Sequence, residues 1–210
     1  MNSDNAKWFE LIAVIATATL KFVFIDWLNL RAAYIILTCL FWIFYIYFKY
    51  KGDPAVLSRW GIQRAYFRDT FLFLLPPAVV FMLGIGMYGY FSGAELPSWH
   101  ILPVLMLYPL WGLIQQFIMA GLVSGNLKAI RNPRFTNSQV ILVTSLLFSL
   151  VHFPDGFLMF FTFIMQWFFT TAFLRWKNIW PLGLYHGWIA TFLLYYILER
   201  DLWVELMAGF

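Results

Sequence analysis

Charged residues are scarce in this chain of 210 residues: they make up 11% of it, whereas hydrophobic residues make up 62% and aromatic residues 22%. So few charges cannot cover the surface of a soluble domain, which excludes the soluble globular class. A single cysteine excludes a disulfide framework. Phosphate-binding glycine loops and nucleic-acid modules are also missing, so no nucleic-acid partner is expected. The composition indicates an integral membrane protein in contact with membrane lipids.

Apolar runs of roughly 20 residues predict spanning helices, because the strands of a barrel are only about 10 residues long. We expect an all-α bundle of about seven spans, near residues 8–25, 32–48, 70–91, 99–123, 138–152, 157–174 and 179–198. Glu10 and Lys21 lie near the ends of the first run, where they can reach an interface. Basic and apolar residues alternate from Lys49 to Asp69, which suggests an amphipathic helix on the membrane surface, with a plain basic loop as the alternative.

Positive charge is distributed unevenly over the two sides that seven spans create. Eleven Lys and Arg residues fall before the first span or in the loops after the second, fourth and sixth spans. Only Arg31 and Arg200 fall on the opposite side. Because cytoplasmic loops carry the excess of Lys and Arg, we expect a cytoplasmic N-terminus and an exported C-terminus.

Three apolar runs each carry polar side chains that are costly in hydrocarbon unless they find a partner. They are Gln115 with Gln116, the run from Phe148 to His152, and His186. Each has a structural explanation alone, as amide contacts between helices, a helix-end histidine and a hydrogen-bonded core histidine. Together they predict one shared interior site. Helical rise opposes this convergence, because it places His152 toward the exported side and the other two clusters toward the cytoplasmic half.

Two other chemistries fit these residues less well. A metal site would need His100, His152 and His186 with Asp155, and no HExxH pair is present, so no metal or cofactor is expected. A serine nucleophile would be Ser149, one helical turn before His152, but no GxSxG elbow surrounds it.

The order of the polar motifs resembles the CPBP family, which comprises type II CAAX prenyl endopeptidases and bacteriocin-processing or immunity proteins, also called Abi. Members carry EExxxRG, then FxxxH, then HxxxN, and residues 115–121, 148–152 and 186–190 stand at those positions here. The resemblance implies a CPBP-like core in residues 99–210, spans four to seven. A three-span region of residues 1–98, with the basic amphipathic segment near 50–69, precedes this core. It also implies the bacterial inner membrane, and a membrane-anchored protein or lipoprotein as substrate or partner.

The departures from the family pattern bear on catalysis. In the family, the first glutamate is the expected general base, the first histidine assists it, and the last histidine and asparagine form an oxyanion hole. Here glutamine replaces both glutamates, Ala120 replaces the arginine and Ala190 replaces the asparagine. A glutamine amide cannot serve as a base near neutral pH, so the usual water activation is absent. The remaining site candidates are His152, His186, Gln115 and Gln116.

Three functions are compatible with these residues. The favoured one is a membrane-embedded CPBP-like enzyme, either an intramembrane peptidase or a related acyl- or peptidyl-transfer enzyme. Its base would be His152 or His186, and the glutamines would position the substrate. The second is a non-catalytic scaffold, chaperone or immunity protein with the same fold. The third is a carrier or lipid-binding protein with a polar cavity.

Overall fold

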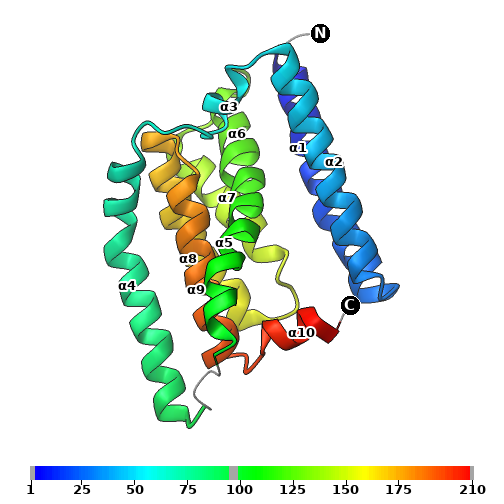
Figure 1. Cartoon of the computed structure of the whole chain (residues 1–210). Coiled ribbons are helices and arrows are strands. Elements are labelled where there is room, and N and C mark those ends of the chain that lie inside the picture. The colour runs from blue at the N-terminus through cyan, green and yellow to red at the C-terminus, as the bar shows by residue number, and fades with distance from the viewer. Residues whose placement is uncertain (1–2, 95–98, 209–210) are drawn as a thin grey trace. The chain divides into compact units, whose positions relative to one another are not determined.

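The computed structural model describes residues 3–94 and 99–208, and nearly all of them are helical (Figure 1). No strand occurs in these residues. The chain forms two compact units, one of Met1–Gln63 with Ile118–Lys177, the other of Arg64–Phe117 with Asn178–Phe210. The chain therefore passes from one unit to the other three times. The predicted division at residue 98, which follows the family resemblance, stays a prediction.

The first unit contains the N-terminal helix pair and an α7–α8 hairpin. Gln139 fixes the start of α7 through a capping box: its N–H donates to Thr136 Oγ1 at 3.3 Å, and its Oε1 accepts from the Thr136 N–H at 2.9 Å. The elements are α1 (Ser3–Lys21), the π-helical η1 (Phe22–Trp27), α2 (Arg31–Gly52), α3 (Val56–Arg59), most of the π-helical η2 (Phe117–Ser124), α6 (Gly125–Ala129), α7 (Asn137–Leu150) and α8 (Gly156–Trp176).

A polar cluster around Glu10 ties α1 to α2 and α6. The carboxylate accepts hydrogen bonds from the Tyr45 hydroxyl and from Asn126 Nδ2, the latter at 2.6 Å. Lys49 Nζ lies 3.2 Å from the same carboxylate. A shielded carboxylate is costly unless it is paired and hydrogen-bonded. The sequence predicted only that Glu10 could reach an interface, whereas the structure gives it three side-chain partners within its own unit.

The second unit is built on the packing of α9 (Trp180–Tyr196) against α5 (Ile101–Gln116) and α4 (Phe67–Ser92), and it ends in α10 (Leu202–Ala208). Asn178 fixes the start of α9, because its Oδ1 accepts from the Trp180 N–H at 3.0 Å. Its Nδ2 donates to the Ala65 carbonyl at 2.7 Å, which ties this helix start to the segment before α4. Pro181 fits in the first turn, where no backbone donor is needed.

Glycines allow α5 and α9 to approach closely. A Cβ atom added to Gly187 would lie 2.4 Å from the backbone nitrogen of Pro109, and one added to Gly112 would lie 2.4 Å from the Gly183 carbonyl oxygen. No larger side chain fits at these points without moving the backbone. Small residues at helix crossings are typical of membrane proteins, because they let helices pack without a hydrophobic driving force.

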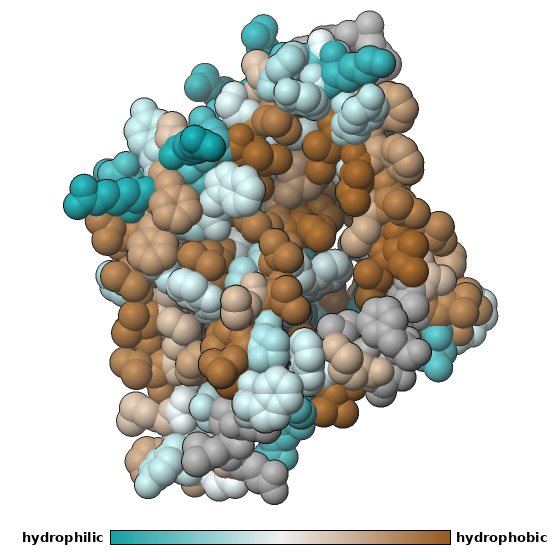
Figure 2. All heavy atoms as spheres, viewed as in Figure 1, coloured by the Kyte–Doolittle hydropathy of each residue, from teal (hydrophilic) through white to brown (hydrophobic). Residues whose placement is uncertain are grey.

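Five helical segments in the described residues are long and apolar enough to cross a membrane: Asp4–Trp27, Ala33–Gly52, Phe67–Ser92, Ile101–Ala129 and Gly156–Trp176. The other two predicted spans form the shorter helices α7 and α9, of 14 and 17 residues. Along the α1–α2 pair, Figure 2 shows apolar residues over the visible middle and hydrophilic ones at the end where α2 stops. The all-α class with membrane-spanning helices is confirmed, while the count of seven and the single bundle stay predictions.

The surface helix predicted from Lys49 to Asp69 is wrong. In the structure, α2 ends at Gly52, α3 is a single turn, and α4 begins at Phe67. Trp60 is buried and packs on Tyr45, with their ring centroids 6.0 Å apart. The apolar side chain of Trp60 therefore supports the first unit's interior instead of facing a membrane surface.

Candidate functional site

Gln116 and His186 form a buried hydrogen bond inside the second unit. Gln116 Nε2 lies 3.1 Å from His186 Nδ1, and the two residues are 0% and 4% exposed. Gln116 is the last residue of α5, and His186 lies in the first half of α9. A Cβ atom on Gly112 would lie 3.2 Å from the His186 Cβ atom, so the pair sits at the glycine contact. The close approach of the two helices is what brings the amide within reach of the ring.

The partner atoms determine where His186 carries its proton. In the amide orientation of the structure, Gln116 Nε2 faces His186 Nδ1, and because an amide nitrogen can only donate, this orientation assigns Nδ1 as an acceptor without a proton. The neutral ring then holds its proton on Nε2, which becomes a hydrogen-bond donor. A glutamate at position 116 could only accept, and would place the proton on Nδ1 instead. With Gln116 as its partner, His186 therefore presents Nε2 as a hydrogen-bond donor. It does not present Nε2 as a proton acceptor.

His152 is held in the opposite tautomer, in the first unit, in the turn between α7 and α8. Its Nδ1 lies 2.9 Å from the Phe148 carbonyl oxygen. Because a carbonyl oxygen only accepts, Nδ1 carries the proton, and Nε2 of the neutral ring has a free lone pair. Asp155 fixes this turn: its N–H donates to the His152 carbonyl at 3.0 Å, and its Oδ1 accepts from the Leu158 N–H at 3.0 Å. The neutral His152 ring therefore carries its unprotonated nitrogen at Nε2, whereas the neutral His186 ring carries it at Nδ1.

The other two candidates, Gln115 and Ser149, lie on α5 and α7. Gln115 is half-buried in α5, beside Gln116. The Ser149 hydroxyl donates to the Met159 carbonyl at 2.7 Å and so ties α7 to α8. Its proton is directed away from His152, which argues against a serine nucleophile. The structure brings Gln116 and His186 together, whereas His152 belongs to the other unit, and its approach to the pair stays a prediction.

His100 belongs to a different polar cluster, at the start of α10. Its Nδ1 lies 2.6 Å from Asp201 Oδ2, and the Tyr195 hydroxyl donates to Asp201 Oδ1 at 2.9 Å. Burial raises the pKa of Asp201, but the hydrogen bonds from His100, Tyr195 and the Val204 N–H outweigh it, and the net pKa is lowered. Within residues 3–94 and 99–208, no three His, Cys, Asp or Glu side chains are placed to hold a metal ion.

Sequence reasoning missed the glycines that position the pair. Gly183 and Gly187 flank His186 on α9 and stand four residues apart, the small-xxx-small spacing of close membrane helix contacts. That spacing could have predicted that α9 crosses another helix at His186. The partner surface on α5, with Gly112 and Pro109, has no comparable spacing.

A stretch of the chain that includes these residues is similar to a known protein family. Residues 97–192 match the family model of type II CAAX prenyl endopeptidases, Rce1-like. This stretch is 96 of the chain's 210 residues and includes all four predicted site residues. The predicted resemblance is confirmed over that stretch. Neither the curated proteins nor the solved structures include a match to this chain.

Proposed function

We propose that the chain is a membrane-embedded hydrolase of CPBP type that cleaves membrane-associated protein substrates. The observation that carries the proposal is the buried Gln116–His186 hydrogen bond, which lies inside the stretch similar to type II CAAX prenyl endopeptidases. An interior amide and imidazole in contact are expected at a site that must handle a polar bond within an apolar protein. The environment we propose is a bacterial inner membrane, with the N-terminus cytoplasmic.

The proposed reaction uses each histidine for one role. A water molecule gives a proton to His152 Nε2, and its oxygen attacks the carbonyl carbon of the scissile bond. The carbonyl oxygen becomes an oxyanion, which accepts a hydrogen bond from His186 Nε2–H. The carbon–nitrogen bond then breaks, and protonated His152 returns its proton to the leaving amine. Gln116 positions His186, and the half-buried Gln115 amide is proposed to hold the substrate.

In this proposal His152 takes over the water activation that a glutamate is expected to perform in the family. No carboxylate stands at positions 115 and 116, so we assign water activation to a histidine. Ala190 cannot donate as the family's asparagine would, which leaves His186 as the proposed oxyanion donor on α9. The mechanism requires His152 to approach the Gln116–His186 pair, and this approach is part of the proposal.

A non-catalytic scaffold is the second candidate, and the altered motif favours it. The same Gln116–His186 bond that would position a catalytic group also joins α5 to α9 in the interior. In a scaffold this contact serves assembly with a membrane-anchored partner. The two candidates differ in one observable, because only the enzyme forms a cleaved product.

The test is terminal-peptide mass spectrometry on membranes that contain or lack the chain. We expect shortened forms of membrane-anchored proteins or lipoproteins when the chain is present, and full-length forms when it is absent. As a control, the double variant His152→Ala/His186→Ala is produced at the same abundance, and it should give no shortened forms. Identical peptide profiles in all three membranes would reject the hydrolase and leave the scaffold.

A further inference from the structure

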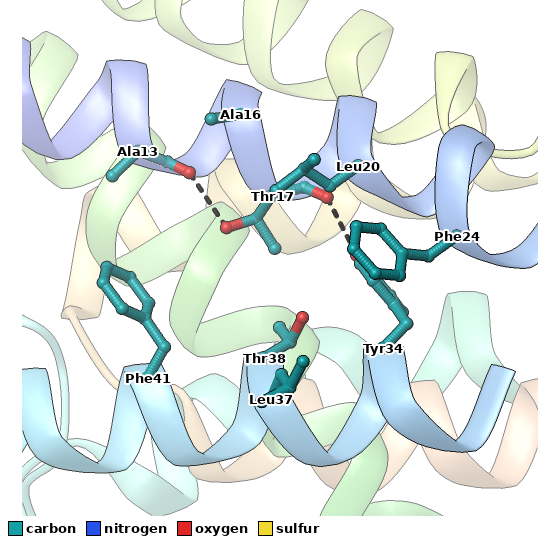
Figure 3. Close-up of a pocket in the computed structure, with 9 residues that line it drawn as sticks. All are labelled: Ala13, Ala16, Thr17, Leu20, Phe24, Tyr34, Leu37, Thr38 and Phe41. Carbon is teal, nitrogen blue, oxygen red and sulfur yellow. Dashed lines mark hydrogen bonds between the residues drawn. The ribbon is translucent and has the colours of Figure 1, made fainter. Parts of the chain in front are cut away.

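A groove of about 440 Å³ lies between α1 and α2, entirely within the first unit (Figure 3). Its volume falls in the range of small-molecule sites, roughly 300–1,000 Å³. Thr17 of α1 and Thr38 of α2 face each other across it (Figure 3). Nine residues form its walls: Ala13, Ala16, Thr17, Leu20, Phe24, Tyr34, Leu37, Thr38 and Phe41.

Hydrocarbon dominates the walls, because two of their three hydroxyl groups, those of Thr17 and Tyr34, donate to backbone carbonyls. Thr17 Oγ1 donates to the Ala13 carbonyl at 2.9 Å, and the Tyr34 hydroxyl donates to the Thr17 carbonyl at 2.8 Å, as the dashed lines in Figure 3 show. A buried water needs two to four polar partners, and the Thr38 hydroxyl alone among methyl groups and rings does not supply them. The chemistry of the groove therefore favours a hydrocarbon ligand over water.

The groove has the depth of a single membrane leaflet. Both of its walls belong to segments that are long and apolar enough to cross a membrane. Lys21 and Asp26 form an ion pair at 3.0 Å beside its Phe24 end, and charged groups of this kind mark the interface. From Ala13 to Phe24 one wall covers about 16 Å, and from Tyr34 to Phe41 the other covers about 10 Å, at roughly 1.5 Å per helical residue. Neither wall exceeds about half of the ~30 Å hydrocarbon core.

We propose that this groove binds one acyl chain of a membrane phospholipid, whose headgroup lies at the level of Lys21 and Asp26. The pair offers one charge of each sign, which complements a zwitterionic headgroup. A transmembrane helix of a partner is a poorer fit, because it would need a groove along the whole ~30 Å of the apolar layer. The bilayer supplies the ligand, and because its acyl chain is already out of water, the binding energy comes from van der Waals contact with the groove walls and from the headgroup beside the ion pair.

The experiment uses the full chain in phosphatidylcholine vesicles that contain a minor share of phosphatidylcholine with a diazirine in the middle of one acyl chain. After illumination, mass spectrometry locates the crosslinks. We expect them to concentrate severalfold on the groove residues of α1 and α2, relative to the outward residues Ile12 and Ile15, which are 59% and 50% exposed. Crosslinks spread evenly over groove and outward residues would overturn the proposal.

Two variants fill the groove, one from each wall, so that failure of one to fold does not end the test. Thr17→Phe and Thr38→Phe should each reduce groove crosslinking severalfold. Thr19→Phe is the matched control: Thr19 is exposed on the same helix, and its hydroxyl donates to the Ile15 carbonyl at 2.9 Å. It should leave groove crosslinking unchanged. Unchanged crosslinking in both groove variants would contradict a lipid ligand.

Discussion

Replacing His152 with alanine is expected to reduce product formation by about 10²- to 10⁴-fold, the usual cost of losing a general base. The reason is that Nδ1 of His152 is committed to the Phe148 carbonyl, which leaves Nε2 as the proton acceptor. The side chain lies in a turn whose capping bonds involve Asp155 and backbone groups, so the variant should remain folded. The measurement is the yield of shortened substrate divided by the amount of folded variant in the membrane.

His100→Ala is the matched control for this prediction. His100 is bound to Asp201 in a separate polar cluster, and its loss should leave product formation within about twofold of wild type. His186→Ala should lower product formation by about 10²- to 10³-fold, the cost of losing one oxyanion donor. Product formation by His152→Ala at the wild-type level and normal abundance would remove His152 as the base.

Gly187→Ala is expected to destabilise the protein by about 3 kcal/mol or more, the upper end of the range for overpacking. The added Cβ would lie 2.4 Å from the Pro109 nitrogen and 2.5 Å from its Cα atom, so the overlap is with backbone and no side chain can rotate to relieve it. The helices α5 and α9 must separate, and the Gln116–His186 bond is then lost. Unfolding of the detergent-solubilised protein, followed by tryptophan fluorescence, measures the change.

Gly84→Ala provides the matched control in the same unit. Gly84 lies inside α4, and a Cβ atom there meets nothing within 4 Å. Because glycine costs a helix about 0.5–1 kcal/mol relative to alanine, this change should be neutral or slightly stabilising. If Gly187→Ala were as stable as Gly84→Ala, the close contact of α5 and α9 would be wrong, and with it the position of Gln116 beside His186.

Burial of polar groups made part of this structure predictable. Polar side chains in apolar runs must find partners, and this reasoning selected Gln116 and His186, which contact each other across 70 positions of sequence. The lengths of the apolar runs predicted the segments that form the long helices. Two predicted spans are shorter than a full membrane crossing, because α7 and α9 have only 14 and 17 residues.

Contacts that depend on three-dimensional proximity were not predictable from single positions. The sequence placed Glu10 at an interface because it stands near the end of the first apolar run. Its partners Tyr45 and Asn126 are 35 and 116 positions away. Basic and apolar residues alternate around Trp60 as in a surface helix, yet in the structure Val56 and Trp60 are buried in the protein. The tautomer of each histidine depends on the atom that its Nδ1 contacts, and the spacing of residues in the sequence does not show that atom.

The most direct test of the mechanism is the tautomer of each histidine, measured by nitrogen NMR of the ¹⁵N-histidine-labelled protein. The chain has only three histidines, so single substitutions assign the signals. At a pH where both rings are neutral, we predict a proton on Nδ1 of His152 and on Nε2 of His186. In Gln116→Glu with the carboxyl ionised, His186 Nδ1 should carry a proton, because a carboxylate can only accept. A wild-type His186 protonated on Nδ1, or a His152 protonated on Nε2, would contradict the assigned roles of donor and base.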